Sequence, residues 1–501
     1  MILQYFKKNS TVLFLVIYLI FIFFILSSYK NYSVSWDEQY HLVSGKYQIE
    51  NLLSPKKSTS AISNYDLLTH GSFFDMVYFS PLKLFHQEEN YELLHLIKAL
   101  FSSLTLIFIF LSLKKVSSKW FTPIIGVVLL ILFPRWLGDI FDNHMDVIAA
   151  LLYSIQIYLA LIILTRKKEQ NKYLFIIFGI ISAIVFSHRM ILFTVQAVLL
   201  VFYILKTKRI RWSLDFVKPF LFFAVSFLIA LIIIDPAVRS FNPLIIVQRI
   251  IYSLRFRWTR TMLFESRQIF ARDLPWYYLP KWIAITTPII TIVLLLNGLI
   301  ITLKRKNLID YFLPTVLFFP IILVVILHPV IYDGWRQFIF LSVPLVMVAA
   351  LGFEYVLVRK NSLFKIFASL ILVIGFITTT IGIYRLHPFE YIYFNGMVGG
   401  LKGAFEKYET DYWSKSYREA ALWLEKNEIR DKSKIYNIYS CDFRYSASYY
   451  FSKNMKLVDS LKEADYAICF TRWNADKKIP GKVVYTVERE GTPLSIVKKV
   501  R

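Results

Sequence analysis

Cysteines and acidic residues are scarce in this 501-residue chain. The two cysteines, Cys441 and Cys469, are too few for a zinc cluster or a framework of several disulfides. We expect two buried free thiols, with one disulfide between them as the alternative. Only 34 acidic residues stand against 58 lysines and arginines, so the formal net charge is +24. Because the cations cluster in short segments between apolar runs, they fit the positive-inside rule, and nucleic-acid binding is not expected.

Polar sequence is also scarce. Charged residues make up 18% of the chain and hydrophobic residues 56%, and the mean hydropathy is +0.52, which excludes an ordinary soluble protein. Repeated apolar runs of about 20 residues are each long enough to cross a bilayer. We therefore predict a polytopic α-helical membrane protein with about eleven transmembrane helices. The expected spans lie near residues 11–29, 93–113, 120–134, 147–165, 173–187, 190–206, 217–234, 281–303, 311–328, 337–358 and 363–384.

Basic residues fall in every second loop. Lys7 and Lys8 precede the first apolar run, Thr11–Leu26, which we interpret as a retained helix because no signal-peptide cleavage site follows it. Further basic segments lie near residues 114–119, 166–172, 206–218, 304–306 and 359–365. This alternation predicts a cytoplasmic N-terminus. The other loops and the C-terminal tail then face outward, and function is expected there.

The tail beyond residue 384 is more polar than the rest of the chain. We predict a transmembrane catalytic domain over residues 1–384 and a small extracytoplasmic α/β module over residues 385–501. A helix is expected at Ser416–Asn427 from its 3.6-residue periodicity. Strands are expected at Lys434–Ser440, Tyr466–Phe470, Val483–Val487 and Leu494–Val500.

An acidic pair, Asp37 and Glu38, lies just past the first apolar run. A carboxylate near a low-dielectric surface has a raised proton affinity unless it is paired, so it can accept a proton from an attacking hydroxyl. The alternative is a pair of solvated loop acids beside a helix. We assign Asp37 and Glu38 to catalysis, and the nearby His41 to substrate binding.

Asp139, Asp142 and Asp146 are spaced i, i+3 and i+7, which on a helix places all three on one face. Like charges this close require a cation, which is a metal, an arginine or a substrate amine. The alternative is a set of acids favoured by the dipole at a helix N-terminus. Oxygen ligands suit Mg²⁺ or Mn²⁺, so a divalent cation is one option, although we assign no metal ligands. Asp139 is assigned to catalysis, and Asp142 and Asp146 to substrate binding.

The outward loop 235–280 carries seven arginines interleaved with aromatic residues, against the positive-inside trend. Forked guanidinium donors suit a phosphate, so we assign Arg255, Arg257 and Arg260 to a lipid-linked phosphate. A generic amphipathic surface helix is the alternative.

Two short motifs at span ends complete the candidate site. His188 and Arg189 contact a phosphate or extend to the interface. Asp333 and Arg336 are assigned to substrate binding, although a simple ion pair between them is the plainer interpretation.

Together these segments resemble the GT-C superfamily of membrane glycosyltransferases, in particular bacterial relatives of the protein O-mannosyltransferases (glycosyltransferase family 39) and of the lipid A aminoarabinose transferase. The segments that carry the resemblance are Trp36–His41, Tyr65–Phe74, Asp139–Asp146, Tyr332–Phe338, His387–Asn395 and Asp411–Trp413. The chain departs from these relatives in having no MIR-type module, fewer spans than the aminoarabinose enzyme and a short tail.

The resemblance implies that Asp37 matches the essential first-loop aspartate of the family. It also implies a polyprenyl-phosphate sugar donor bound from the outer leaflet of a bacterial inner (plasma) membrane. The expected activity is inverting transfer of a hexosyl or pentosyl group to an acceptor hydroxyl on a glycan, lipid or protein. The alternative is a flippase or transporter of lipid-linked sugars, which requires ionisable groups deep within spans.

Overall fold

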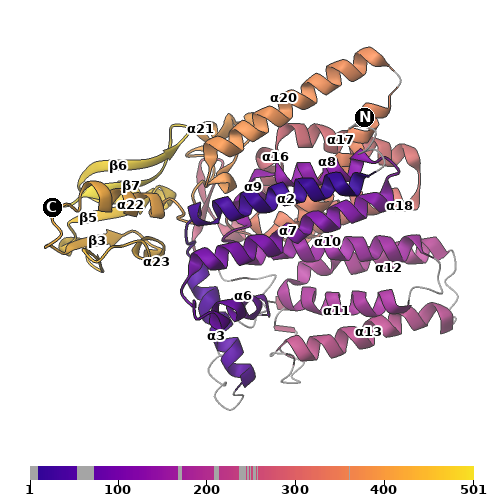
Figure 1. Ribbon diagram of the computed structural model, residues 1–501, viewed down its shortest axis with the longest axis horizontal. Helices are drawn as coiled ribbons and strands as arrows, with labels where there is room; N and C mark the ends of the chain where they lie inside the picture. Colours follow the sequence, from indigo (N-terminus) through magenta and orange to yellow (C-terminus); the bar gives the residue numbers. More distant parts are fainter. Residues whose placement is uncertain are drawn as a thin grey trace.

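The computed structural model is mainly helical, and a C-terminal sheet projects from one end of the helices (Figure 1). It describes residues 9–53, 73–166, 172–207, 214–235, 258–359 and 361–501, together with residues 238, 244, 247, 248, 250, 251 and 256. Lys7 and Lys8, most of the segment Tyr65–Phe74, and Arg255 and Arg257 lie outside these described residues.

Each of the eleven predicted spans contains a helix. Within the described residues, eight helical segments are long and apolar enough to cross a membrane. Two further consecutive helices, which meet at a bend of 114°, make a ninth span if they are counted as one. The eight contain α2 (Ser10–Ser28), α7 (Tyr91–Val116), α10 (His144–Thr165), α12 (Thr194–Thr207), α13 (Leu214–Ile234), α18 (Leu308–Leu327), α19 (Ser342–Val358) and α20 (Ser362–Leu386). The bent pair is α16 (Tyr278–Thr286) and α17 (Ile289–Arg305), and the shorter apolar helices are α8 (Phe121–Ile131) and α11 (Lys172–His188). The chain is thus an integral membrane protein.

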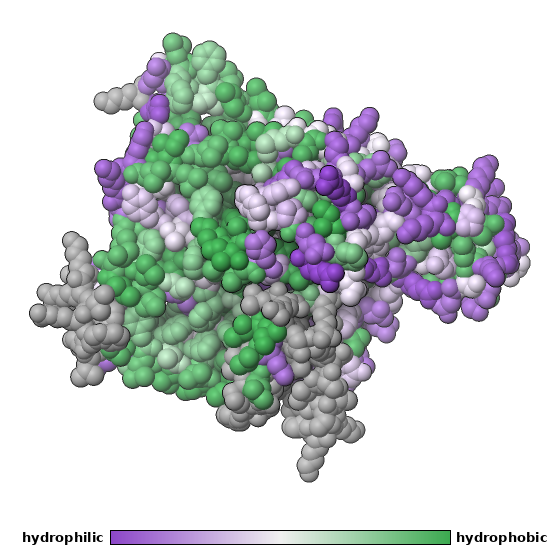
Figure 2. All heavy atoms as spheres, turned by 180° about the vertical axis from the view of Figure 1, so that it is seen from behind, coloured by the Kyte–Doolittle hydropathy of each residue, from purple (hydrophilic) through white to green (hydrophobic). Residues whose placement is uncertain are grey.

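Burial separates the central helices from the peripheral ones. In the most apolar stretch of each helix, 89% of the residues are buried in α10 and 78% in the segment that contains α19. The corresponding shares are only 17% in α2 and 11% in α20. Because lipid tails are as apolar as leucine side chains, a helix that is apolar on all sides can occupy either place. On the face shown in Figure 2, apolar residues predominate over the helices, whereas hydrophilic residues are more frequent on the projecting C-terminal module.

Helices α17 and α19 approach each other closely at two glycines. A Cβ atom at Gly298 would lie 1.9 Å from the carbonyl oxygen of Val348, and one at Gly352 would lie 1.9 Å from that of Leu294. Small residues allow such backbone approach between membrane helices. This contact fixes α19, which continues directly from the 3₁₀ helix η6 (Arg336–Leu341) at the rim of the bundle.

The C-terminal module is a five-stranded sheet with the strand order β4-β3-β5-β7-β6. Its strands are β3 (Tyr436–Ser440), β4 (Met455–Val458), β5 (Tyr466–Phe470), β6 (Lys482–Arg489) and β7 (Thr492–Lys499), and α22 (Tyr417–Asn427) packs on the sheet. The four predicted strands and the predicted helix are confirmed. The strand β4 was not predicted, because its four residues are bounded by polar sequence without an alternating pattern.

Cys441 and Cys469 form a disulfide between the end of β3 and β5. The expectation of two free thiols is therefore wrong. Sequence alone could not pair them, because their closeness, with Cα atoms 4.8 Å apart, follows from the parallel pairing of β3 with β5.

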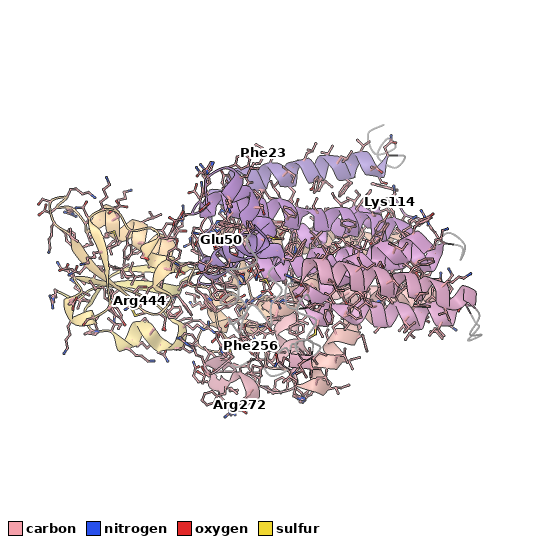
Figure 3. All side chains as sticks on the ribbon, turned by 90° about the horizontal axis from the view of Figure 1, so that it is seen from below. Phe23, Glu50, Lys114, Phe256, Arg272 and Arg444 are labelled. Atoms are coloured by element: carbon pink, nitrogen blue, oxygen red, sulfur yellow. A yellow bond between two sulfur atoms is a disulfide. The ribbon has the colours of Figure 1, made fainter. Side chains whose placement is uncertain are left out.

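Residues between α20 and α22 lie against the helices. The Asn395 side chain donates to the carbonyl oxygens of Ala284 and Thr287, both at 2.7 Å, across the bend between α16 and α17. A hairpin of β1 (Thr261–Phe264) and β2 (Arg267–Phe270) contacts the module, where the Thr261 carbonyl oxygen accepts a hydrogen bond from Trp473. Lys114, in the last turn of α7, lies far from Arg444 of the module (Figure 3).

We expect Gly352→Ala to destabilise the helical bundle by about 1–3 kcal/mol, because the new Cβ meets the Leu294 backbone. Thermal unfolding of the detergent-purified protein, followed by loss of the monodisperse peak, measures this. Gly396→Ala is the matched control, since its Cβ meets only the Ile289 side chain at 3.4 Å. Equal midpoints for the two variants would contradict the close helix contact.

Replacing Cys441 and Cys469 together by serine should lower the stability of the module by about 3–4 kcal/mol, since the disulfide closes a loop of 28 residues. Limited proteolysis measures the change, and cleavage should shift to the module while the helices stay intact. Labelling of wild-type protein by a thiol reagent without prior reduction would show that the disulfide is absent.

Candidate active site

Asp37 lies in a turn at the rim of the helical bundle, directly before α3 (Glu38–Leu53). Its side chain is 19% exposed, and its Oδ2 lies 3.7 Å from Nη1 of Arg336. Burial raises the pKa of Asp37 to about 6, although Arg336 and then His41 favour the charged form. Asp37 therefore combines access to solvent with a raised proton affinity, as a general base requires.

Glu38 is the first residue of α3 and is buried. Its carboxylate lies 2.5 Å from Nζ of Lys98 and 3.0 Å from Nε2 of His95, both on α7, and accepts a hydrogen bond from the backbone N–H of Ser35. Burial opposes its charge, but Lys98 and His95 outweigh burial and lower the pKa of Glu38 to about 2. Glu38 therefore fixes the turn that presents Asp37.

The three aspartates of the 135–146 loop are not on one helix, so that interpretation is wrong. The helix α9 (Pro134–Asp139) ends at Asp139, and α10 begins at His144 after a turn. Asn143 caps α10 by accepting from the backbone N–H of Asp146, and its side-chain amide bonds the carboxylates of Asp146 at 2.7 Å and Asp139 at 3.4 Å. The turn still gathers the acids, because Asn143 stands between them.

Lys415 is the cation between Asp139 and Asp142. It is fully buried, and its Nζ lies 2.6 Å from Asp142 and 3.6 Å from Asp139. It also donates to the carbonyl oxygen of Gly138. Burial raises the pKa of Asp139 to about 6 even though Lys415 favours its charged form. The sequence left open a metal, an arginine or a substrate amine, and the structure instead places a lysine between Asp139 and Asp142.

Arg336 lies at the centre of a second ion-pair network. Its guanidinium lies 3.3 Å from Asp146 and 3.4 Å from Asp333, in addition to Asp37. Asp146 also pairs with Arg189, whose side chain is 14% exposed. Asp333 adopts a left-handed backbone conformation before Gly334, and this turn places it beside Arg336 at the start of η6.

The module contributes to this network through Arg472. Its guanidinium contacts Asp333 and lies 2.8 Å from Glu409, and it donates to the carbonyl oxygen of Tyr412. Burial raises the pKa of Glu409 to about 7, with Arg472 opposing the rise. Asp333 is thus held between an arginine of the helical bundle and an arginine of the sheet module.

Two of the predicted histidines, His41 and His188, lie near these networks. His41 lies 3.2 Å from Asp75 on α6 (Phe73–Leu84). Burial opposes the charge of His41, but Asp75 outweighs it and raises the pKa of His41. His188 is buried, and its Nε2 contacts the carbonyl oxygen of Met145 at 2.7 Å, so it faces the protein interior and not the interface.

The predicted arginines of the 235–280 loop do not all meet at this site. Arg260 lies at the module, where it pairs with Asp442 at 3.1 Å and covers the ring of Trp473. Arg255 and Arg257 lie outside the described residues, and their phosphate role stays a prediction.

Sequence reasoning missed six residues of these ion-pair networks: Asp75, His95, Lys98, Glu409, Lys415 and Arg472. Lys98 left a signal, because it is the only lysine or arginine within the predicted span 93–113. Lys415 and Arg472 left none, since their partners Asp142 and Asp333 are 273 and 139 residues away.

In the part of the chain that the structure describes, no group of three or more His, Cys, Asp or Glu side chains is placed to hold a metal ion. Binding of Mg²⁺ or Mn²⁺ stays a prediction from the sequence.

No family model and no curated protein matches the chain in sequence. Several solved structures resemble it over most of its length, and two of them are described here. One is ArnT from Cupriavidus metallidurans bound to undecaprenyl phosphate, with a TM-score of 0.55 and 10% identity over 99% of this chain and 98% of ArnT. The other is the oligosaccharyltransferase AglB from Archaeoglobus fulgidus, in complex with an inhibitory peptide and a dolichol-phosphate. Its TM-score is 0.51, with 12% identity over 93% of this chain and 70% of AglB.

These likenesses extend over nearly the whole chain although few residues are identical. They agree with the resemblance carried by the Trp36–His41 and Tyr332–Phe338 segments. The chain therefore has the fold of the GT-C glycosyltransferases.

Proposed function

We propose that the chain is a membrane glycosyltransferase that moves a hexosyl or pentosyl group from a polyprenyl-phosphate-linked donor to an acceptor hydroxyl. The observation that carries the proposal is the partly exposed Asp37 carboxylate, which lies 3.7 Å from Arg336 at the rim of the bundle. The fold supports it, because ArnT and AglB were solved with undecaprenyl phosphate and dolichol-phosphate, respectively.

In the proposed reaction, Asp37 takes the proton of the acceptor hydroxyl as its oxygen attacks the anomeric carbon. The bond between that carbon and the donor phosphate oxygen breaks, and polyprenyl phosphate leaves with the electron pair. Attack opposite the phosphate inverts the anomeric centre. The raised pKa of Asp37 matches a base that works near neutral pH.

Arg189 and Arg336 are the described candidates for the departing phosphate. Nε of Arg189 is buried without a hydrogen-bond partner among the described residues, and the arginine is paired only through its terminal nitrogens. Arg336 lies 3.7 Å from Asp37, which is the longest of its three carboxylate contacts. We expect a phosphate oxygen of the donor to replace this contact most readily. A fixed guanidinium beside a developing anion stabilises the transition state.

The proposed orientation places this site on the outer face of a bacterial plasma membrane. Lys114, in the last turn of α7, lies at a helix end away from the module, which favours a cytoplasmic location for that end (Figure 3). The Cys441–Cys469 disulfide favours an oxidising compartment for the module.

A flippase or transporter is the alternative. Transporter sites are expected near the bilayer midplane, between repeats or broken helices. The charged groups described here instead gather at the helix ends, with Asp146 and Arg336 at one end and Glu354, paired with Arg305, at the other. This distribution favours the transferase.

Asp37→Asn should lower sugar transfer by about 10²–10⁴-fold, because it removes the general base without changing side-chain size. The assay uses protein purified in detergent, where transport cannot occur, with a radiolabelled polyprenyl-phosphate sugar and a delipidated envelope extract as acceptor. Asp273→Asn, at an exposed carboxylate, is the matched control. Wild-type transfer by the Asp37 variant would remove Asp37 from the mechanism, and absence of transfer by wild-type protein with a broad donor set would favour the transporter.

The rate at low substrate concentration should fall about tenfold per pH unit below pH 6, because Asp37, with a pKa of about 6, is active only when deprotonated. His41→Gln should move this acid limb to higher pH, since it removes a positive neighbour that lowers the pKa of Asp37. A pH profile of kcat/KM for both proteins tests this. An unchanged acid limb in the variant would assign the titration to another group.

A further inference from the structure

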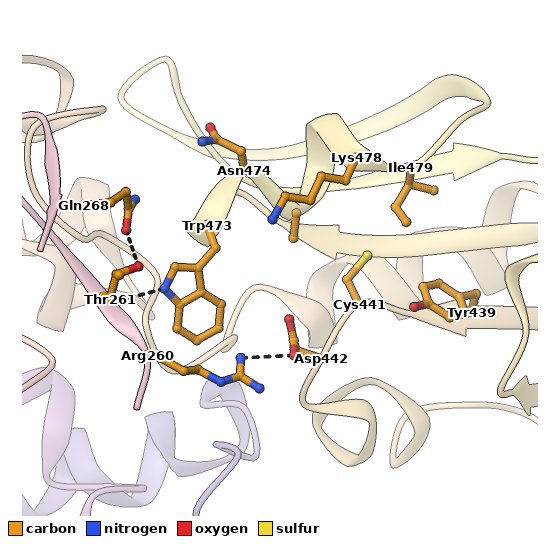
Figure 4. A pocket seen from close by; sticks show the side chains of 11 residues that line it. Arg260, Thr261, Gln268, Tyr439, Cys441, Asp442, Trp473, Asn474, Lys478 and Ile479 are labelled. Carbon is orange, nitrogen blue, oxygen red and sulfur yellow. Dashed lines mark hydrogen bonds and ion pairs between the residues drawn. The ribbon is translucent and has the colours of Figure 1, made fainter. Parts of the chain in front are cut away.

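A cavity of about 640 Å³ lies between the β1–β2 hairpin and the C-terminal module (Figure 4). This hairpin–module pocket has walls from the hairpin, from the turn after β3, and from the segment after β5. The lining side chains used below are those of Arg260, Gln268, Asp442, Trp473, Asn474 and Lys478. Its volume falls within the roughly 300–1,000 Å³ typical of small-molecule sites.

Planar polar groups line part of the pocket, beside the rings of Trp473 and Tyr439. The Arg260 guanidinium pairs with Asp442 and covers the Trp473 ring at 4.5 Å. Gln268 accepts a hydrogen bond from the Thr261 hydroxyl and keeps its amide N–H groups for another partner. Among the described residues, the side chains of Asn474 and Lys478 have no hydrogen-bond or ion-pair partner. Figure 4 shows Lys478 extended toward the pocket.

Three residues that line the pocket have left-handed backbone conformations although none is glycine: Asp442, Trp473 and Asn474, with φ of 49°, 54° and 54°. Non-glycine residues in this region are uncommon and cluster at functional sites. Trp473 is held by a hydrogen bond from its indole N–H to the carbonyl oxygen of Thr261. Its neighbour Asn474 is thereby directed to the pocket rim.

This chemistry favours a sugar over a lipid tail or a peptide strand. A lipid tail requires an apolar channel, whereas the aliphatic lining here is limited to Ala475 and Ile479. A peptide that adds to a strand requires free backbone groups at its edge, and the Thr261 carbonyl is already bonded to Trp473. Carboxamide, guanidinium and carboxylate groups fixed around one cavity instead match neighbouring hydroxyls.

We propose that the hairpin–module pocket binds the saccharide part of the acceptor, with Lys478 facing an acidic substituent of that saccharide. The proposal rests on the proposed transferase function and specifies its acceptor class.

The pocket shares a wall with the candidate active site. Phe443, next to Asp442, stacks on Trp36 with ring centroids 4.9 Å apart, and Trp36 directly precedes Asp37. On the other side, Arg472 precedes Trp473 and contacts Asp333, which pairs with Arg336. A saccharide held in the pocket therefore lies one layer of aromatic side chains from the proposed base.

The test uses the full-length protein in nanodiscs without donor. The probes are di- to hexasaccharides released from the envelope of cells that produce the protein and separated into neutral and acidic fractions, with tryptic envelope peptides as a third fraction. Binding is read by saturation-transfer difference NMR. We expect the acidic saccharides to bind and Lys478→Met and Asn474→Ala each to weaken binding about tenfold. Lys462→Met, at an exposed lysine elsewhere on the module, should bind as wild type.

Absence of saccharide binding, preference for the peptides, or equal binding by wild type and both pocket variants would each overturn the proposal. Acceptor titration in the transfer assay separates it from the proposed function. Transfer with an unchanged acceptor KM in both variants would overturn the pocket assignment alone. If both variants weaken saccharide binding but wild-type protein transfers sugar from no donor, the pocket assignment stands and the proposed transferase function is overturned.

Discussion

The arrangement of the site depends on the buried ion pairs around Arg336. One guanidinium contacts Asp146, Asp333 and Asp37, which come from the start of α10, the turn before η6 and the loop after α2. Removing one partner of a buried ion pair leaves an uncompensated charge and is costly, so these three segments are held together. Asp37 is the most exposed of the three acids and has the longest contact with Arg336, as the proposed role of a base requires.

The C-terminal part of the chain completes this arrangement. Lys415 pairs with Asp139 and Asp142, and Arg472 contacts Oδ1 of Asp333 while Arg336 contacts Oδ2. The module therefore does more than cover the outer face. Its position is coupled by charge to the proposed base, and the hairpin–module pocket is formed where it meets the β1–β2 hairpin. In the proposed reaction, the donor reaches Asp37 along the apolar helices and the acceptor reaches it from the aqueous side.

Sequence patterns predicted the helices and strands better than the contacts between their side chains. Helices at all eleven predicted spans, the helix Ser416–Asn427 and four strands follow from local patterns of apolar residues, which need no tertiary information. The single-helix interpretation of Asp139, Asp142 and Asp146 is wrong, because spacing carries no information about the turn that Asn143 caps. The free-thiol expectation is wrong because only the pairing of β3 with β5 brings Cys441 to Cys469.

The sequence by itself determined a polytopic membrane protein with polar chemistry after the first span, because apolar length and charge are properties of local segments. It also pointed to Asp37, Arg189 and Arg336, which do meet near one cluster. Only the tertiary structure decided that Glu38 is locked by Lys98, that Arg260 lies at the module, and that Lys415 and Arg472 complete the site. The reason is that ion pairing acts through space between residues hundreds of positions apart, and no local pattern records it.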